Sequence, residues 1–133
     1  MNMTAVPPVL AATDFSPAAE QAVRRAAHIA RELGAPLVLV HVHEPPVLGE
    51  VWRQLQAWVP GVSGAEAQAL QQSAQTRLQA AAQAMGTELG SPVVARLLAG
   101  RASAAVAAEA AACGAQLVVI GARGEHGLAE AVL

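Results

Sequence analysis

Four apolar runs without polar alternation stand out along the chain. They cover residues Val9–Thr13, Pro36–Val42, Pro92–Leu98 and Gln116–Gly121. A continuous apolar run is typical of a strand in a parallel sheet that lies between layers of helices. We therefore expect four such strands, and we expect both faces of the fourth one to be buried.

Between these runs, apolar residues recur at the spacing of amphipathic helices. Ser16 and Pro17 form an N-cap and a first helical residue, and Gly34 a C-terminal cap, so the first helix is expected between them. Further helices are predicted at about 65–85 and over 101–113. The apolar stripe predicted for the 65–85 helix consists of Ala67, Leu70, Ala74, Leu78, Ala81 and Met85.

The alternation of strand and helix, with mostly short connections, predicts an open parallel α/β sheet with right-handed crossovers. The exception is the Pro- and Gly-rich segment 43–64, in which residues 51–59 are expected to form a short helical turn. A length of 133 residues suits one domain, 1–133, with a single core.

Charge and aromatic content limit the choice of partners. The net charge is −2, no lysine is present, and the aromatic residues are Phe15, Trp52 and Trp58. This composition offers neither the basic stripe nor the stacking platform of a nucleic-acid-binding protein. No apolar run reaches the roughly 18 residues of a membrane span, and neither a signal peptide nor an internal disulfide is expected. We expect a cytoplasmic protein with no nucleic-acid or membrane partner.

The residues that could bind a ligand lie where the strands end, which is where open α/β sheets bind ligands. The first strand ends in Ala12–Asp14, the second in His41–His43, the third in Ala99–Gly100 and the fourth in Ile120–Gly124. Glycines there either let backbone N–H groups approach an anion or simply turn the chain.

The polar residues at these ends have two readings each. Asp14 is either a ligand residue or a turn residue, and Arg123 either contacts a phosphate or is a solvated charge. His41 and His43 lack a third ligand, so no metal site is expected. Since no nucleophile or base can be assigned, no catalytic residue is expected either.

These strand ends resemble those of the universal stress protein family. Its members place an acidic residue between the first strand and a serine-capped helix, end the second strand in His-Val, and continue from the fourth strand into Gly-x-x-Gly. The resemblance covers the whole chain and implies a sheet of order 3-2-1-4 with helices on both faces, like that of adenine nucleotide alpha hydrolases. The family's Gly-Ser or Gly-Thr would begin after Leu133, so we expect a sheet without the family's fifth strand.

The resemblance also implies a binding site for an adenine nucleotide, ATP or AMP, bound with or without Mg²⁺. Asp14 matches the acidic residue near the ribose and phosphates, and Val42 matches the position whose main chain contacts adenine. The site would lie at the ends of strands one, two and four. The implied site residues are Ala12, Thr13, Asp14, Val42, Gly100, Ile120, Gly121, Arg123 and Gly124.

The function expected from these features is stress response or signalling through a bound adenine nucleotide. One alternative is a regulatory interaction module of the same fold that binds no nucleotide, and a weaker one is an enzyme that hydrolyses ATP. An unpaired fourth strand would expose hydrogen-bonding groups at the sheet edge. We therefore also expect the chain to form a homodimer through this strand or the helices beside it.

Overall fold

The computed structural model describes residues 6–43 and 64–121. Its elements are β1 (Val9–Ala12), α1 (Pro17–Leu33), β2 (Leu37–His43), α3 (Gly64–Leu89), β3 (Val93–Ala99), α4 (Ala102–Cys113) and β4 (Leu117–Val119). The helical turn expected at 51–59 lies outside the described residues, as do Arg123 and Gly124.

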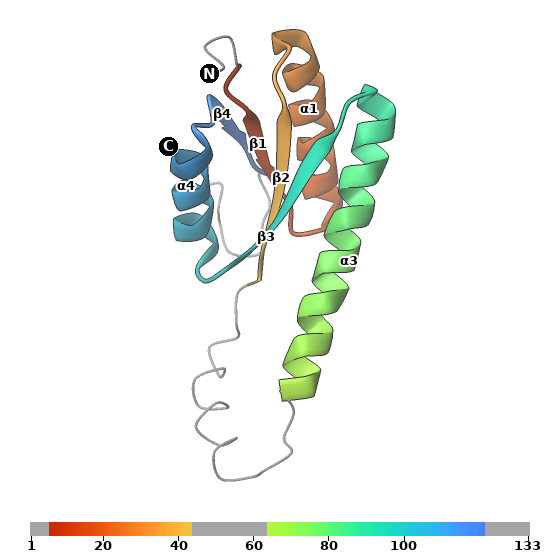
Figure 1. The fold of residues 1–133 in the computed structure, drawn as a ribbon, viewed down its shortest axis with the longest axis vertical. Coiled ribbons are helices and arrows are strands. Elements are labelled where there is room, and N and C mark those ends of the chain that lie inside the picture. The colour runs from red at the N-terminus through yellow and green to blue at the C-terminus, as the bar shows by residue number, and fades with distance from the viewer. Residues whose placement is uncertain (1–5, 44–63, 122–133) are drawn as a thin grey trace.

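The strands form one parallel sheet in the order β3-β2-β1-β4 (Figure 1). This confirms the strand order and direction expected above. Among the described helices, none is long and apolar enough to cross a membrane.

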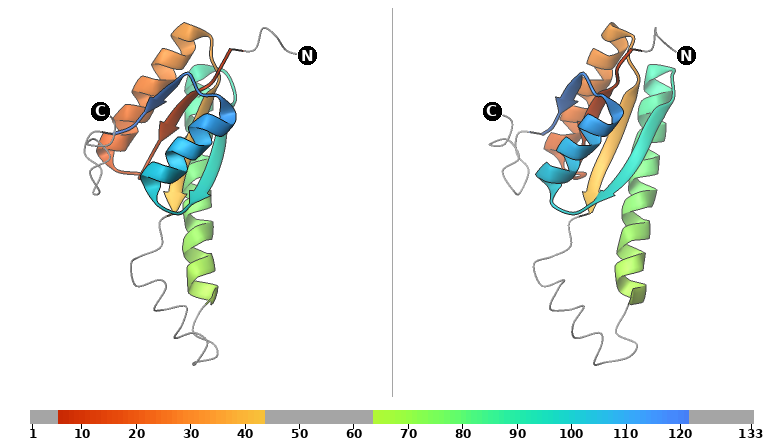
Figure 2. Two further views of the ribbon diagram at one scale, coloured as in Figure 1. Left: turned by 90° about the vertical axis from the view of Figure 1, so that its left-hand side faces the viewer. Right: turned by 60° about the vertical axis from the view of Figure 1, so that its left-hand side comes forward.

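Helices cover both faces of the sheet (Figure 2). Successive residues of a strand point to opposite faces, so the sheet contributes to two apolar clusters, one on each face. The cluster under α1 and α3 contains Val9, Ala11, Leu37 and Leu39, together with helix residues such as Leu78. The cluster under α4 contains Leu10, Val38, Val40 and Val106.

The expectation that both faces of the fourth strand are buried was wrong. Leu117 and Val118 are each 37% exposed. Strand β4 lies at one edge of the described sheet, with β1 as its neighbour. Val118 pairs with Leu10 and so faces the α4 side, but α4 contacts β2 and β3, and Val118 is not among the described residues that pack in the α4 cluster.

The apolar stripe predicted for the long helix was wrong at Leu70. Helix α3 spans 26 residues, ends at Leu89 instead of Met85, and buries Leu78, Ala82 and Met85. Leu70 is 64% exposed. The N-terminal part of α3 extends beyond the sheet (Figure 1), so an apolar residue there has no core to enter.

Candidate functional site

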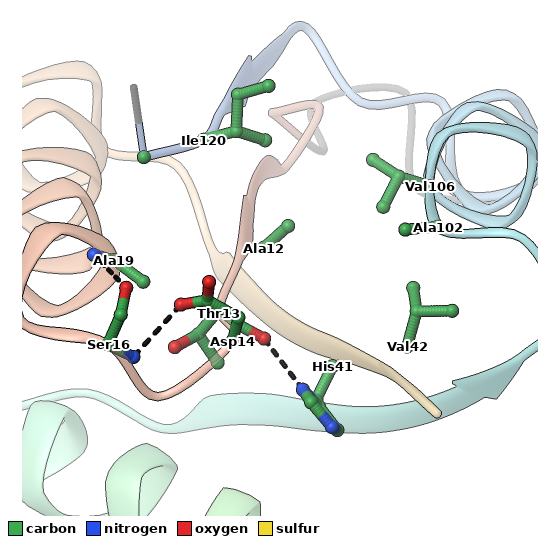
Figure 3. Close-up of a pocket in the computed structure, with 11 residues that line it drawn as sticks. Ala12, Thr13, Asp14, Ser16, Ala19, His41, Val42, Ala102, Val106 and Ile120 are labelled. Atoms are coloured by element: carbon green, nitrogen blue, oxygen red, sulfur yellow. Dashed lines mark hydrogen bonds between the residues drawn. The ribbon is translucent and has the colours of Figure 1, made fainter. Parts of the chain in front are cut away.

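A pocket opens at the carboxyl ends of β1, β2 and β4, between the N-termini of α1 and α4 (Figure 3). Its cavity volume is about 70 Å³, whereas ligand pockets usually measure about 300–1,000 Å³. The described residues therefore form the floor of a cleft rather than an enclosed chamber. They are Ala12, Thr13, Asp14, Ser16, Ala19, His41, Val42, Ala102, Val106, Ile120 and Gly121.

One wall of the pocket is apolar. Ala12 of β1 and Val42 of β2 lie on the face that α4 covers, and both pack against the cluster around Val106. Ala102, in the first turn of α4, and Ile120, just after β4, extend this wall around the open space (Figure 3). Such a wall suits a flat apolar surface, such as an aromatic ring.

The main chain of Val42 faces the pocket side of β2. The carbonyl of Val40 accepts a hydrogen bond from Thr13 N at 2.9 Å, whereas the carbonyl of His43 accepts one from Gly100 N, on the β3 side, at 3.3 Å. Backbone groups of successive residues alternate between the two sides of a strand, so Val42 shares the side of Val40. Because the β1 pairing ends at Ala12, this main chain lies beyond the end of β1.

The opposite wall is polar and belongs to the loop between β1 and α1. Three side-chain oxygens in this loop accept hydrogen bonds from backbone N–H groups. Thr13 Oγ1 accepts from Phe15 N at 2.9 Å, Asp14 Oδ1 from Ser16 N at 2.9 Å, and Ser16 Oγ from Ala19 N at 3.1 Å. The last of these is the N-cap expected for α1, and together they hold Asp14 and Ser16 at the pocket.

Asp14 carries the negative charge of the pocket. Partial burial raises the pKa of its carboxyl group, but the hydrogen bonds from Ser16, together with smaller contributions from its own backbone and from the nearby His41, outweigh this effect. The net pKa therefore lies below the ordinary value for an aspartate. The side chain is ionised at neutral pH and can accept hydrogen bonds from hydroxyl groups or balance a cation.

Gly121 brings the end of β4 against the first turn of α1. A Cβ atom at this position would lie 3.2 Å from both Cα and N of Ala19 and 3.3 Å from the carbonyl carbon of Ala18. The atoms it would meet are all backbone, which cannot easily move aside. The absence of a side chain at Gly121 therefore sets how closely the fourth strand approaches the helix.

The structure brings most of the predicted site residues together. Six of them line the pocket: Ala12, Thr13, Asp14, Val42, Ile120 and Gly121. Gly100 is not part of the lining; it begins the turn from β3 into α4, with a φ of +117° that favours glycine. Arg123 and Gly124 lie outside the described residues.

Sequence reasoning missed five residues of the lining: Ser16, Ala19, His41, Ala102 and Val106. Ser16 and His41 had a usable signal, since the serine cap and the His-Val ending were already recognised. The two α4 residues had none, because α4 is alanine-rich around its circumference and no face is marked by its pattern. Within the described ranges, no group of three or more His, Cys, Asp or Glu side chains is placed to hold a metal ion.

Comparison with known proteins agrees with this fold. The model of the universal stress protein family matches residues 6–133. A member of that family from Burkholderia pseudomallei is 25% identical with a TM-score of 0.69, over 95% of this chain and 90% of that one. No curated protein matches the sequence.

Two further solved structures share the fold at lower identity. The universal stress protein UspA from Lactobacillus plantarum is 23% identical with a TM-score of 0.61, over 90% of this chain and 79% of that one. A universal stress protein solved in complex with cAMP is also 23% identical, with a TM-score of 0.60, over 98% of this chain and 86% of that one.

Proposed function

Because this chain belongs to the universal stress protein family, we propose that it acts in stress response or signalling by binding an adenine nucleotide, ATP or AMP, at this pocket. The observation that carries the proposal is that residues from three separate strand ends line one pocket. The structural neighbour in complex with cAMP supports an adenine nucleotide as the class of ligand.

Each part of a nucleotide has a matching part of the pocket. The apolar wall formed by Val42, Val106 and Ile120 accommodates the adenine ring, and the Val42 main chain offers hydrogen bonds to its edge. The Asp14 carboxylate accepts hydrogen bonds from ribose hydroxyls. The N-termini of α1 and α4 both border the pocket and favour phosphate oxygens.

Calorimetric titration of the full chain with ATP, AMP and cAMP, with and without Mg²⁺, tests this proposal. Ala102→Leu enlarges a side chain of the pocket wall and is expected to weaken binding by tenfold or more, about 1.4 kcal/mol. Ala104→Leu is the matched control, since Ala104 lies in the same turn of α4, is exposed and does not line the pocket. Equal affinities of the two variants would contradict the proposed site.

The small pocket favours one alternative, a regulatory interaction module that binds no nucleotide. A volume of about 70 Å³ is below the usual range for a ligand of this size. Absence of heat with all three nucleotides, from a chain whose fold is verified by circular dichroism, would favour the module. Binding of any one of them at micromolar concentration would exclude it.

We also propose that the protein is not an enzyme. The polar groups of the described pocket, Asp14, Ser16, Thr13 and His41, are engaged in hydrogen bonds that shape the loop between β1 and α1. Phosphate release from ATP is therefore expected to equal that of a protein-free blank. Release well above the blank, lost in Asp14→Asn, would establish slow hydrolysis instead.

We further propose a homodimer that forms through β4. Val118, on this edge strand of the described sheet, is 37% exposed and faces the α4 side. Light scattering of wild type at micromolar concentration should report a dimer, and Val118→Lys should yield more monomer. Val94→Lys is the control, on the opposite edge strand β3 at 45% exposure. A monomeric wild type would refute the proposed dimer.

A further inference from the structure

Three side chains from separate elements form a stack beside the pocket. The guanidinium carbon of Arg77, on α3, lies 4.2 Å from the ring centroid of Phe15. The ring of Phe15, in the loop between β1 and α1, lies 4.4 Å from that of His41, on β2, with an angle of 36° between the planes. A cation at this distance from an aromatic ring is attracted to its electron-rich face.

Phe15 has an unusual backbone. Its φ is +66°, in the left-handed region that aromatic residues rarely adopt, and no other described residue except glycine has a positive φ. A residue stays in such a conformation only where its surroundings hold it there. The contacts of Phe15 include the hydrogen bond from its N–H to Thr13 Oγ1, the Arg77 guanidinium group, the His41 ring and the apolar cluster under α1 and α3.

His41 joins the stack to the end of β1. Its Nδ1 lies 2.7 Å from the carbonyl oxygen of Thr13, and since a carbonyl can only accept, Nδ1 donates the proton. His41 and Thr13 both line the pocket, whereas Phe15 and Arg77 do not. The stack therefore connects the pocket lining to two residues outside it.

The other end of the stack is the exposed Arg77, which is carried by a helical turn that packs in the core. Arg77 precedes Leu78, which has no exposed surface and packs in the cluster under α1 and α3. Phe15 packs against the same cluster. The turn of α3 that carries Arg77 is thus fixed relative to the sheet. The guanidinium group of Arg77 contacts the loop from this turn, through the ring of Phe15.

We propose that Arg77 is a positioning residue of the pocket. It acts through Phe15 and His41 to hold the Thr13–Ser16 loop in the conformation that presents Asp14 and Ser16 to a ligand. The effect on ligand affinity rests on the proposed nucleotide function, but the effect on the loop can be measured without any ligand.

The first experiment measures amide hydrogen exchange by NMR in the ¹⁵N-labelled full chain without nucleotide. In Arg77→Gln, the amides of Phe15 and Ser16 are expected to exchange roughly threefold to fivefold faster, as for loss of one exposed cation–π contact. The core amide of Leu39 should be unaffected, which shows that the fold is intact. Arg77→Lys keeps the cation and should restore most of the protection.

Three further variants test the route through Phe15: a control at Arg24, Phe15→Leu, and Phe15→Leu combined with Arg77→Gln. Arg24→Gln is the control, since Arg24 is an exposed arginine on α1 that pairs with Glu20 and Glu88 and should leave the loop unchanged. Phe15→Leu removes the ring and should raise exchange at Ser16 by itself. Adding Arg77→Gln to Phe15→Leu should then have no further effect, whereas additive effects would overturn the route through Phe15.

The second experiment repeats the ATP titration with these variants. Arg77→Gln should weaken binding by a similar factor and Arg77→Lys should recover it, while Arg24→Gln binds as wild type. Unchanged loop exchange in Arg77→Gln would overturn the positioning role, whatever the nucleotide affinity. Faster loop exchange in a chain whose wild type binds no nucleotide would support the role in shaping the loop and overturn the proposed ligand instead.

Discussion

Gly121 is a residue at which the chain after β4 packs closely against the backbone of α1. A methyl group there would lie 3.2 Å from backbone atoms of Ala19, closer than side chains normally pack. Gly121→Ala is expected to destabilise the protein by about 1–3 kcal/mol, the usual effect of overpacking, and to weaken nucleotide binding because the pocket rim shifts.

Urea unfolding and calorimetry measure the two effects of Gly121→Ala. Ala19→Gly should not rescue this variant, because the close contacts are with the backbone of Ala19 and not with its side chain. A variant as stable as wild type would show that β4 and α1 can separate at this point without cost.

The lowered pKa of Asp14 predicts that the stability of the protein falls at low pH. Its pKa is lowered in the folded state, so it contributes stability above its unfolded pKa of about 3.9 and loses that contribution as the pH falls through the folded value. Asp14→Asn keeps an oxygen that can accept from Ser16 N but removes the charge. The difference in unfolding free energy between wild type and variant should be constant above about pH 5 and shrink below it.

Urea unfolding of both proteins from pH 7 down to about pH 3 measures this difference. A difference that stays the same over the whole range would show that the charge of Asp14 does not contribute to folding. Growth of the difference toward low pH would mean that the carboxyl pKa is raised and not lowered.

At the scale of elements, helix α3 shows that an apolar residue stabilises a helix only where the sheet lies beneath it. Leu78 is fully buried, whereas Leu70 is 64% exposed on the same predicted stripe. Leu78→Ala is expected to cost about 2–5 kcal/mol of stability, and Leu70→Ala to change it by no more than about 0.5 kcal/mol.

The two leucine variants control for each other, since both replace leucine by alanine within one helix and alanine has a similar or better helix propensity. Denaturant unfolding measures both. Equal losses of stability in the two variants would show that Leu70 contacts another part of the protein.

The same contrast explains how far the elements could be predicted. Apolar runs located the strands closely, with β1 expected at Val9–Thr13 and found at Val9–Ala12. Caps located α1 equally well, because Ser16 and Gly34 act through local hydrogen bonds that a sequence pattern records. Burial of Val118 and Leu70 depends on which distant element packs against them. The residues next to them in the sequence do not reveal that packing.

The residues of the candidate site also divide into those that local sequence predicts and those that depend on tertiary packing. Residues at strand ends, such as Thr13 and Val42, were predictable because parallel strands bring their carboxyl ends to one edge. Ala102 and Val106 were not, because their place depends on how α4 crosses the sheet. The Arg77–Phe15 contact joins residues from α3 and the loop after β1 and requires the packed structure.

At the scale of the whole molecule, the pocket is an assembly of β1, β2, β4 and two helix N-termini, which meet only in the folded chain. A ligand that binds this assembly binds the folded state alone and raises its stability, by about 2.7 kcal/mol at a concentration 100 times its Kd. For a domain of this size we expect saturating ATP or AMP to raise Tm by roughly 10 °C.

Thermal unfolding with increasing nucleotide measures this shift, and the variants assign it to the pocket. Ala104→Leu should show the wild-type shift and Ala102→Leu little or none, because only Ala102 lines the pocket. Arg77→Gln should show a reduced shift at subsaturating nucleotide, since its loop is held less firmly before the ligand binds. A full shift in Ala102→Leu would mean that the nucleotide stabilises the protein from another surface, and the pocket at the strand ends would lose its assigned ligand.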